Sequence, residues 1–160
     1  MTGKGGRPMP QSLSLVIVHF VWSTKDRYPF INEEGRQALH GYLATLCQAL
    51  GCHCFEIDGT KDQVHVATTL PRTLSQADLV EDAKKKSSKW FKAEGRSPMA
   101  RKFAWQRGYA AFSVSQGRLP SVVRYMQRQE VHHERIAFQD EYRKLLIRHG
   151  VEFDERYVWD

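Results

Sequence analysis

Cysteine is scarce in this sequence, which contains only three among 160 residues. Cys47, Cys52 and Cys54 are an odd number and include no Cys-x-x-Cys spacing. The chain therefore has neither the disulfide framework of a small secreted protein nor the ligand pattern of a structural zinc site. We therefore expect all three cysteines to be present as reduced thiols.

Long apolar segments are absent too. No run approaches the roughly 18 residues that a membrane-spanning helix needs, and residues 1–7 lack the apolar centre of a signal peptide. We therefore expect a cytoplasmic protein. A Gly-x-x-x-x-Gly-Lys-Ser/Thr motif is also missing, which argues against a reaction driven by ATP bound in such a loop.

The composition is that of a globular domain. Hydrophobic residues make up 41% of the chain and charged residues 26%, and both values are ordinary. We predict a disordered tail at residues 1–12, where Gly, Lys and Pro recur, and one domain at 13–160. The net charge of +6 favours a polyanionic partner. A basic protein without such a partner is the alternative.

Hydrophobic periodicity predicts the element order β-α-β-β-α-β, followed by further helices. We expect strands at 13–23, 52–57, 64–70, 103–106 and 110–114, and helices at 32–50, from 73 or 75 to about 93, from 120 through 129, and at 138–149. This order indicates an α+β, ferredoxin-like split βαβ fold, with an antiparallel sheet, helices on one face and additional C-terminal helices. The other face of such a sheet would be open to a ligand.

Two pairs of polar side chains are candidates for a site. Gln63 and His65 share one face of a predicted strand, because successive strand side chains alternate. Tyr125 and Gln129 are four residues apart on a predicted helix and lie side by side. Each residue alone is more often structural, but together they suggest a metal site with a tyrosine nucleophile. His19 is either a buried, hydrogen-bonded histidine or a neighbour of this site.

Cationic residues form a second group of candidates. The loop at 24–30 mixes cations with aromatic side chains, as single-strand binding requires, although those aromatics could equally fill the core. The helix that starts near residue 75 is covered with lysines, which are commonly just solvated. The predicted nucleic-acid contacts are Lys25, Arg27, Lys84, Lys85, Lys89 and Arg124.

With these residues in view, the sequence resembles the single-tyrosine transposases of the IS200/IS605 insertion-sequence type, within the HUH endonuclease group. The resemblance is carried by residues 19–25, 62–65, 87–90, 125–130, 132–133, 138–142 and 149–157. It implies binding of hairpin DNA at element ends, followed by cleavage and rejoining of single-stranded DNA through a 5′-phosphotyrosine. It also implies a homodimer in which Gly117 could serve as a hinge.

The resemblance further implies a Mg²⁺ or Mn²⁺ ion held by two histidines and a glutamine. The nucleophile corresponds to Tyr125, the glutamine to Gln129 and the second histidine to His65. The first histidine is replaced by Gln63. An amide oxygen still suits Mg²⁺, but its reach differs from that of imidazole, so we expect weaker metal binding or a silent site.

Three functions therefore remain to be compared. The first is a metal-dependent transposase that uses Tyr125, and the second is a weakened or inactive relative that binds DNA hairpins. The third is an RNA-binding ferredoxin-like domain, but the predicted strands lack the clustered aromatic residues of such domains.

Overall fold

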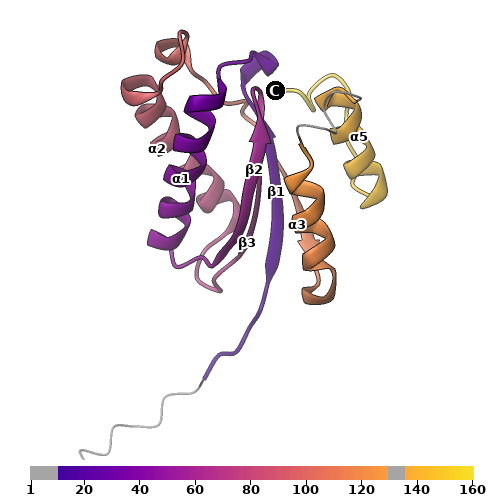
Figure 1. The fold of residues 1–160 in the computed structure, drawn as a ribbon. Coiled ribbons are helices and arrows are strands. Elements are labelled where there is room, and N and C mark those ends of the chain that lie inside the picture. Colours follow the sequence, from indigo (N-terminus) through magenta and orange to yellow (C-terminus); the bar gives the residue numbers. More distant parts are fainter. Residues whose placement is uncertain (1–10, 130–135) are drawn as a thin grey trace, which may run out of the picture.

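A computed structural model describes residues 11–129 and 136–160. Its strands form one antiparallel sheet in the order β2-β3-β1-β4 (Figure 1). The main elements are β1 (Ile17–Ser23), α1 (Glu33–Ala49), β2 (Cys54–Thr60), β3 (Gln63–Thr69), α2 (Gln76–Glu94), β4 (Ala110–Val114), α3 (Leu119–Gln127) and α5 (Phe138–Arg148). The predicted α+β, split βαβ architecture is confirmed.

The alternation of side chains along β1 separates two hydrophobic clusters. Val18, Phe20 and Trp22 pack with α1 and α2 in the larger cluster. Val21 points the other way and packs with β4 and α5 in the smaller cluster. Figure 1 shows α1 and α2 on one side of the sheet and α3 and α5 on the other. The face that we expected to be open is thus covered, because α5 has an apolar side of its own.

Capping residues mark the ends of the helices. The Asn32 side chain accepts a hydrogen bond from the Gly35 amide at 2.8 Å, and Ser75 accepts one from the Asp78 amide at 3.0 Å. Both are N-caps that satisfy an otherwise unpaired backbone donor. Gly51 follows α1 with a φ of +82°, a conformation that glycine adopts without steric cost.

Several predicted boundaries are wrong, including the end of the helix expected through residue 129, because α3 ends at Gln127. β1 begins at Ile17 rather than at residue 13, and β2 continues through Gly59 to Thr60. No strand spans residues 103–106, where Trp105 forms only an isolated bridge to Thr24. The apolar residues there are buried by ring packing, with Trp105 edge-on to Trp22 at 5.9 Å. An apolar run therefore resembled a strand because it fills the core.

Some expectations concern residues beyond the described ranges. His132 and His133, which contributed to the family resemblance, lie outside them, as does most of the predicted N-terminal tail. Among the described helices, none combines the length and the apolar composition needed to cross a bilayer.

Candidate active site

The covered face of the sheet carries a cluster of buried polar side chains. In the register of β1 and β3, Val21 is opposite His65 and Ser23 is opposite Gln63. Gln63 and His65 are therefore on the same face as His19, because residues two apart on a strand share a face and paired residues lie on the same side of the sheet. The exposed fractions are 0% for Gln63, 0% for His65 and 4% for His19.

A chain of polar contacts connects four of these side chains. The Tyr125 hydroxyl donates a hydrogen bond to Glu141 Oε1, and the same oxygen lies 3.4 Å from His65 Nε2. His65 Nδ1 lies 2.8 Å from His19 Nε2, so one of these two nitrogens carries the shared proton. The ring centroids of His65 and Tyr125 are 6.1 Å apart. Tyrosine and histidine thus meet within a single chain.

Burial determines the protonation of this cluster. It lowers the pKa of His19 to about 3, with a further contribution from His65, so His19 is neutral at physiological pH. Burial also raises the pKa of Tyr125, and the neighbouring Glu141 carboxylate raises it further. The phenol is therefore protonated at neutral pH and needs a proton acceptor before it can act as a nucleophile.

The two glutamines form a pair beside this chain of contacts. Gln63 Nε2 donates to Gln129 Oε1 at 2.9 Å, and Gln129 Nε2 donates to the Tyr125 carbonyl at 3.4 Å. Gln129 is 1% exposed. The structure thus brings together all four residues of the two predicted pairs.

Glu141 is the member of the cluster that sequence reasoning missed. It lies in the first turn of α5, where an acidic residue usually complements the helix dipole. A signal was nevertheless present, because Glu141 follows Phe138 by three residues and precedes Leu145 by four. That spacing places it on the apolar side of the helix, and it is 2% exposed.

The comparisons with known proteins decide the family. Residues 12–129 match the family model described as IS200-like transposase. The chain belongs to this family. No curated protein matches the chain.

Two solved transposase structures have a similar fold. A protein from Deinococcus radiodurans R1, described as a transposase, is 22% identical with a TM-score of 0.58, covering 79% of this chain and 98% of its own. A REP-associated tyrosine transposase bound to a REP hairpin is 12% identical with a TM-score of 0.59, covering 82% of this chain and 76% of its own. At these identities the likeness concerns the fold.

A divalent cation in this cluster would need several oxygen or nitrogen donors around one point. Among the described residues, no group of three or more His, Cys, Asp or Glu side chains is arranged to hold a metal. The cluster nevertheless offers the His65 imidazole, the Glu141 carboxylate and two amide oxygens, a donor set that suits Mg²⁺ or Mn²⁺. The residues fit in kind, but the hydrogen bond between Gln63 and Gln129 must open before both amides can turn an oxygen to an ion.

The predicted nucleic-acid contacts do not form one surface. Lys85 and Lys89 are exposed on α2, on the opposite side of the sheet from Tyr125 (Figure 1). Arg124 is exposed on α3, next to Tyr125. Lys25 and Arg27 follow β1, where Arg27 lies 5.7 Å from the Trp159 ring.

The Lys84 side chain is bonded to the protein backbone rather than extended into solvent. Its Nζ donates to the backbone carbonyls of Gln106, Arg107 and Gly108 at 2.8, 3.0 and 2.6 Å. Burial lowers its pKa to about 8. While these bonds are made, this ammonium group holds the segment after Trp105 and does not face a phosphate.

Proposed function

We propose that this transposase binds hairpin DNA and cleaves and rejoins single-stranded DNA through a 5′-phosphotyrosine on Tyr125, with Mg²⁺ or Mn²⁺ as cofactor. The observation that carries the proposal is the buried contact of the Tyr125 hydroxyl with Glu141, which also contacts His65. Membership of the family supports it. The similar REP-associated transposase is bound to a REP hairpin, which supports DNA hairpins as the substrate.

The reaction exchanges one phosphoester for another. The Tyr125 oxygen forms a bond to phosphorus, and the bond from phosphorus to the 3′-oxygen breaks, so that a 3′-OH is released. A bound divalent cation would polarise the phosphate. Glu141 orients the phenol and is placed to accept its proton, while His19 fixes the orientation of His65. Because the tyrosyl link conserves the phosphoester, rejoining needs no ATP.

A second candidate function is hairpin binding without cleavage. Gln63 favours it, because this residue stands at the first histidine position of the family pattern and is bonded to Gln129. Such a protein would bind hairpin DNA with a steep dependence on salt and form no covalent product with either metal. A homodimer remains a prediction for both functions.

The two candidates differ in a covalent product. We expect wild-type protein, incubated with labelled hairpin oligonucleotides and Mg²⁺ or Mn²⁺, to yield a protein–DNA adduct that survives denaturation. Tyr125→Phe should abolish it. The matched control is Tyr142→Phe, which removes the hydroxyl of another buried tyrosine on the same face. An adduct that persists in Tyr125→Phe would refute the assignment, whereas hairpin binding without any adduct would favour the second function.

A further inference from the structure

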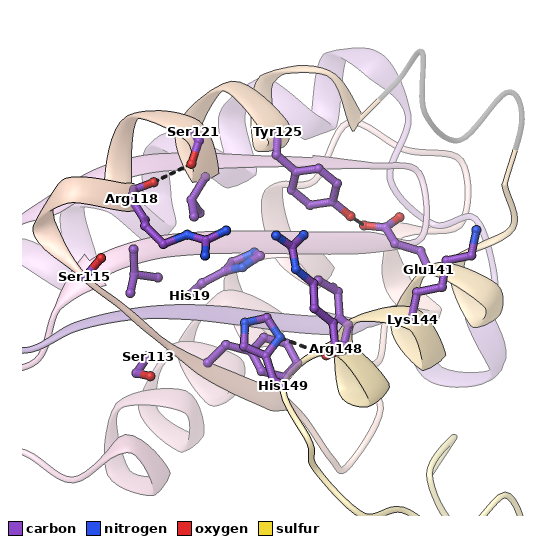
Figure 2. Close-up of a pocket in the computed structure, with 14 residues that line it drawn as sticks. His19, Ser113, Ser115, Arg118, Ser121, Tyr125, Glu141, Lys144, Arg148 and His149 are labelled. Atoms are coloured by element: carbon purple, nitrogen blue, oxygen red, sulfur yellow. Dashed lines mark hydrogen bonds between the residues drawn. The ribbon is translucent and has the colours of Figure 1, made fainter.

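A cavity of about 560 Å³ opens beside the Tyr125 side chain, between β4, the 3₁₀ turn η3 (Gln116–Arg118), α3 and α5. Three cations line it: Arg118 from η3, and Lys144 and Arg148 from α5. Figure 2 shows the guanidinium groups of Arg118 and Arg148 approaching each other across the cavity, near His19 and Tyr125. None of the three cations was predicted from the sequence as a nucleic-acid contact.

Within the described ranges, no acidic side chain pairs with the cations of this cavity. Glu141 is the one acidic residue among the described lining, and it is buried against Tyr125 and His65. Two guanidinium groups that converge without an acid between them create a strongly positive potential.

The chemistry of the cavity matches a phosphodiester. Arginine presents a planar set of donors that binds phosphate oxygens in pairs. Ser113, Ser115 and Ser121 supply hydroxyl groups around the same cavity. Its volume lies within the range of about 300–1,000 Å³ that small-molecule pockets have, which leaves room for a nucleotide. At one wall, the ring of His149 stacks on Phe112 at 4.3 Å and offers a flat surface to a base.

Arg148 lines the same cavity as Tyr125. Its charge lowers the pKa of Tyr125, against the larger effects of burial and Glu141. A phosphate between Arg118 and Arg148 would therefore lie next to the oxygen that attacks it. The lysines of α2 lie on the other side of the sheet and cannot replace this contact (Figure 1).

We propose that Arg118 and Arg148 form a clamp for the phosphodiester that Tyr125 attacks, and that Lys144 holds a neighbouring phosphate of the same single strand. This inference deepens the proposed function and rests on it for the identity of the attacked bond. Binding itself is independent of cleavage, so the clamp can be tested even in a silent protein.

The first measurement is binding of a fluorescein-labelled hairpin oligonucleotide with a single-stranded flank, across a series of KCl concentrations. We expect Arg118→Gln/Arg148→Gln to weaken binding at least tenfold, and to reduce the salt slope by about 0.7, since both arginines contact one phosphate and each single-strand phosphate contact contributes about 0.7. The matched control is Arg156→Gln, which removes an arginine that is already paired with Asp154 at 2.7 Å. Equal affinity and slope in the double variant and this control would overturn the clamp.

A second measurement separates the clamp from a merely structural role. Removing two converging charges should leave Tm unchanged or raise it, whereas a loss of packing would lower it. Arg148→Lys should retain most of the salt slope but slow adduct formation, because lysine keeps the charge and loses the planar donor pair. If the double variant forms the adduct at the wild-type rate, the proposed clamp is wrong, but the assignment of Tyr125 as nucleophile is unaffected. If the wild-type protein forms no adduct, the salt dependence of binding alone tests the clamp.

Discussion

Gln63 is where this chain departs from the family pattern at the residue scale. Its side chain is fully buried, and its amide nitrogen donates to the Gln129 oxygen. In this arrangement the amide oxygens of Gln63 and Gln129 do not both face one ion position. An imidazole at this position would be shorter and could not make the same amide pair. The proposed affinity for a divalent cation therefore depends on which side chain occupies position 63.

We expect Gln63→His to raise the affinity for Mn²⁺ at least tenfold, because imidazole adds a nitrogen ligand beside His65 and frees the Gln129 oxygen. Calorimetric titration of the DNA-free protein with MnCl₂ measures this directly. Gln48→His, at an exposed position of α1, is the control. Unchanged Mn²⁺ affinity in Gln63→His would show that the buried cluster is not the metal site.

Glu141 gives a second prediction at this scale. Glu141→Gln keeps an oxygen that can accept the Tyr125 hydrogen bond, but the amide cannot take the proton. We expect adduct formation to fall by about 10²-fold or more, while Tm does not fall, because a buried charge is removed. Glu152→Gln, an exposed residue, controls for the lost charge. Wild-type rates in Glu141→Gln would rule out a role in activating the phenol.

Sequence reasoning found part of this site. The strand period of two grouped Gln63 with His65, and the structure places these two residues near Gln129 and Tyr125. The helix expected to carry both Tyr125 and Gln129 ends earlier than predicted, because α3 stops at Gln127. Glu141 was not identified as part of the site. Its spacing from Phe138 and Leu145 indicates burial, but not the contact with Tyr125, which joins two helices that lie apart in the chain. Arg118 and Arg148 were missed for the same reason.

The helices and strands show the same division between local and distant information. The predicted ends of the helix at 32–50 agree closely with α1, because Asn32 and Gly51 act on the backbone next to them. The segment at 103–106 was mistaken for a strand, since burial by rings and burial in a sheet give similar apolar runs. The end of β2 was predicted three residues early, at residue 57 rather than at Thr60, because Asp58-Gly59 resembles a turn but lies in β2.

Gly59 is required by a close approach rather than by a turn. A Cβ at this position would lie 2.2 Å from the Gln63 carbonyl oxygen. We expect Gly59→Ala to lower the free energy of unfolding by at least about 2 kcal/mol, since backbone must shift. Gly41→Ala is the matched control, because no atom lies within 4 Å of its Cβ, and it should stabilise α1 by about 0.5–1 kcal/mol. Urea unfolding of both variants checks the pair, and equal effects would contradict it.

His40 on α1 is expected to make the folded protein less stable in acid. Burial, with a contribution from Arg36, lowers its pKa to about 4 from the ordinary 6.5. Between these values the unfolded chain binds a proton that the folded chain does not, so the free energy of unfolding falls as the pH falls from 6.5 to 4. His40→Gln should reduce that fall by on the order of 1–2 kcal/mol. Urea unfolding at pH 7 and pH 4 measures it against His53→Gln, which alters an exposed histidine. An undiminished fall would contradict the assignment.

At the scale of the whole molecule, the two faces of the sheet have different roles. The face under α1 and α2 holds the larger apolar cluster, while the face under α3 and α5 holds the polar cluster and the cationic cavity. The net charge of +6 indicated a polyanionic partner, yet it could not tell which cations converge. Composition adds charges without regard to position, and only folding places Arg118 opposite Arg148.

The central claim is that Tyr125 becomes covalently joined to DNA, and mapping the joined residue tests it most directly. Trypsin cleaves after Arg124 and Arg128, so Tyr125 is released in a peptide of residues 125–128. After reaction with hairpin DNA, Mn²⁺ and nuclease digestion, mass spectrometry should find a nucleotide on this peptide. A nucleotide on another tyrosine, or cleaved DNA ending in a free 5′-phosphate with no peptide attached, would contradict the claim.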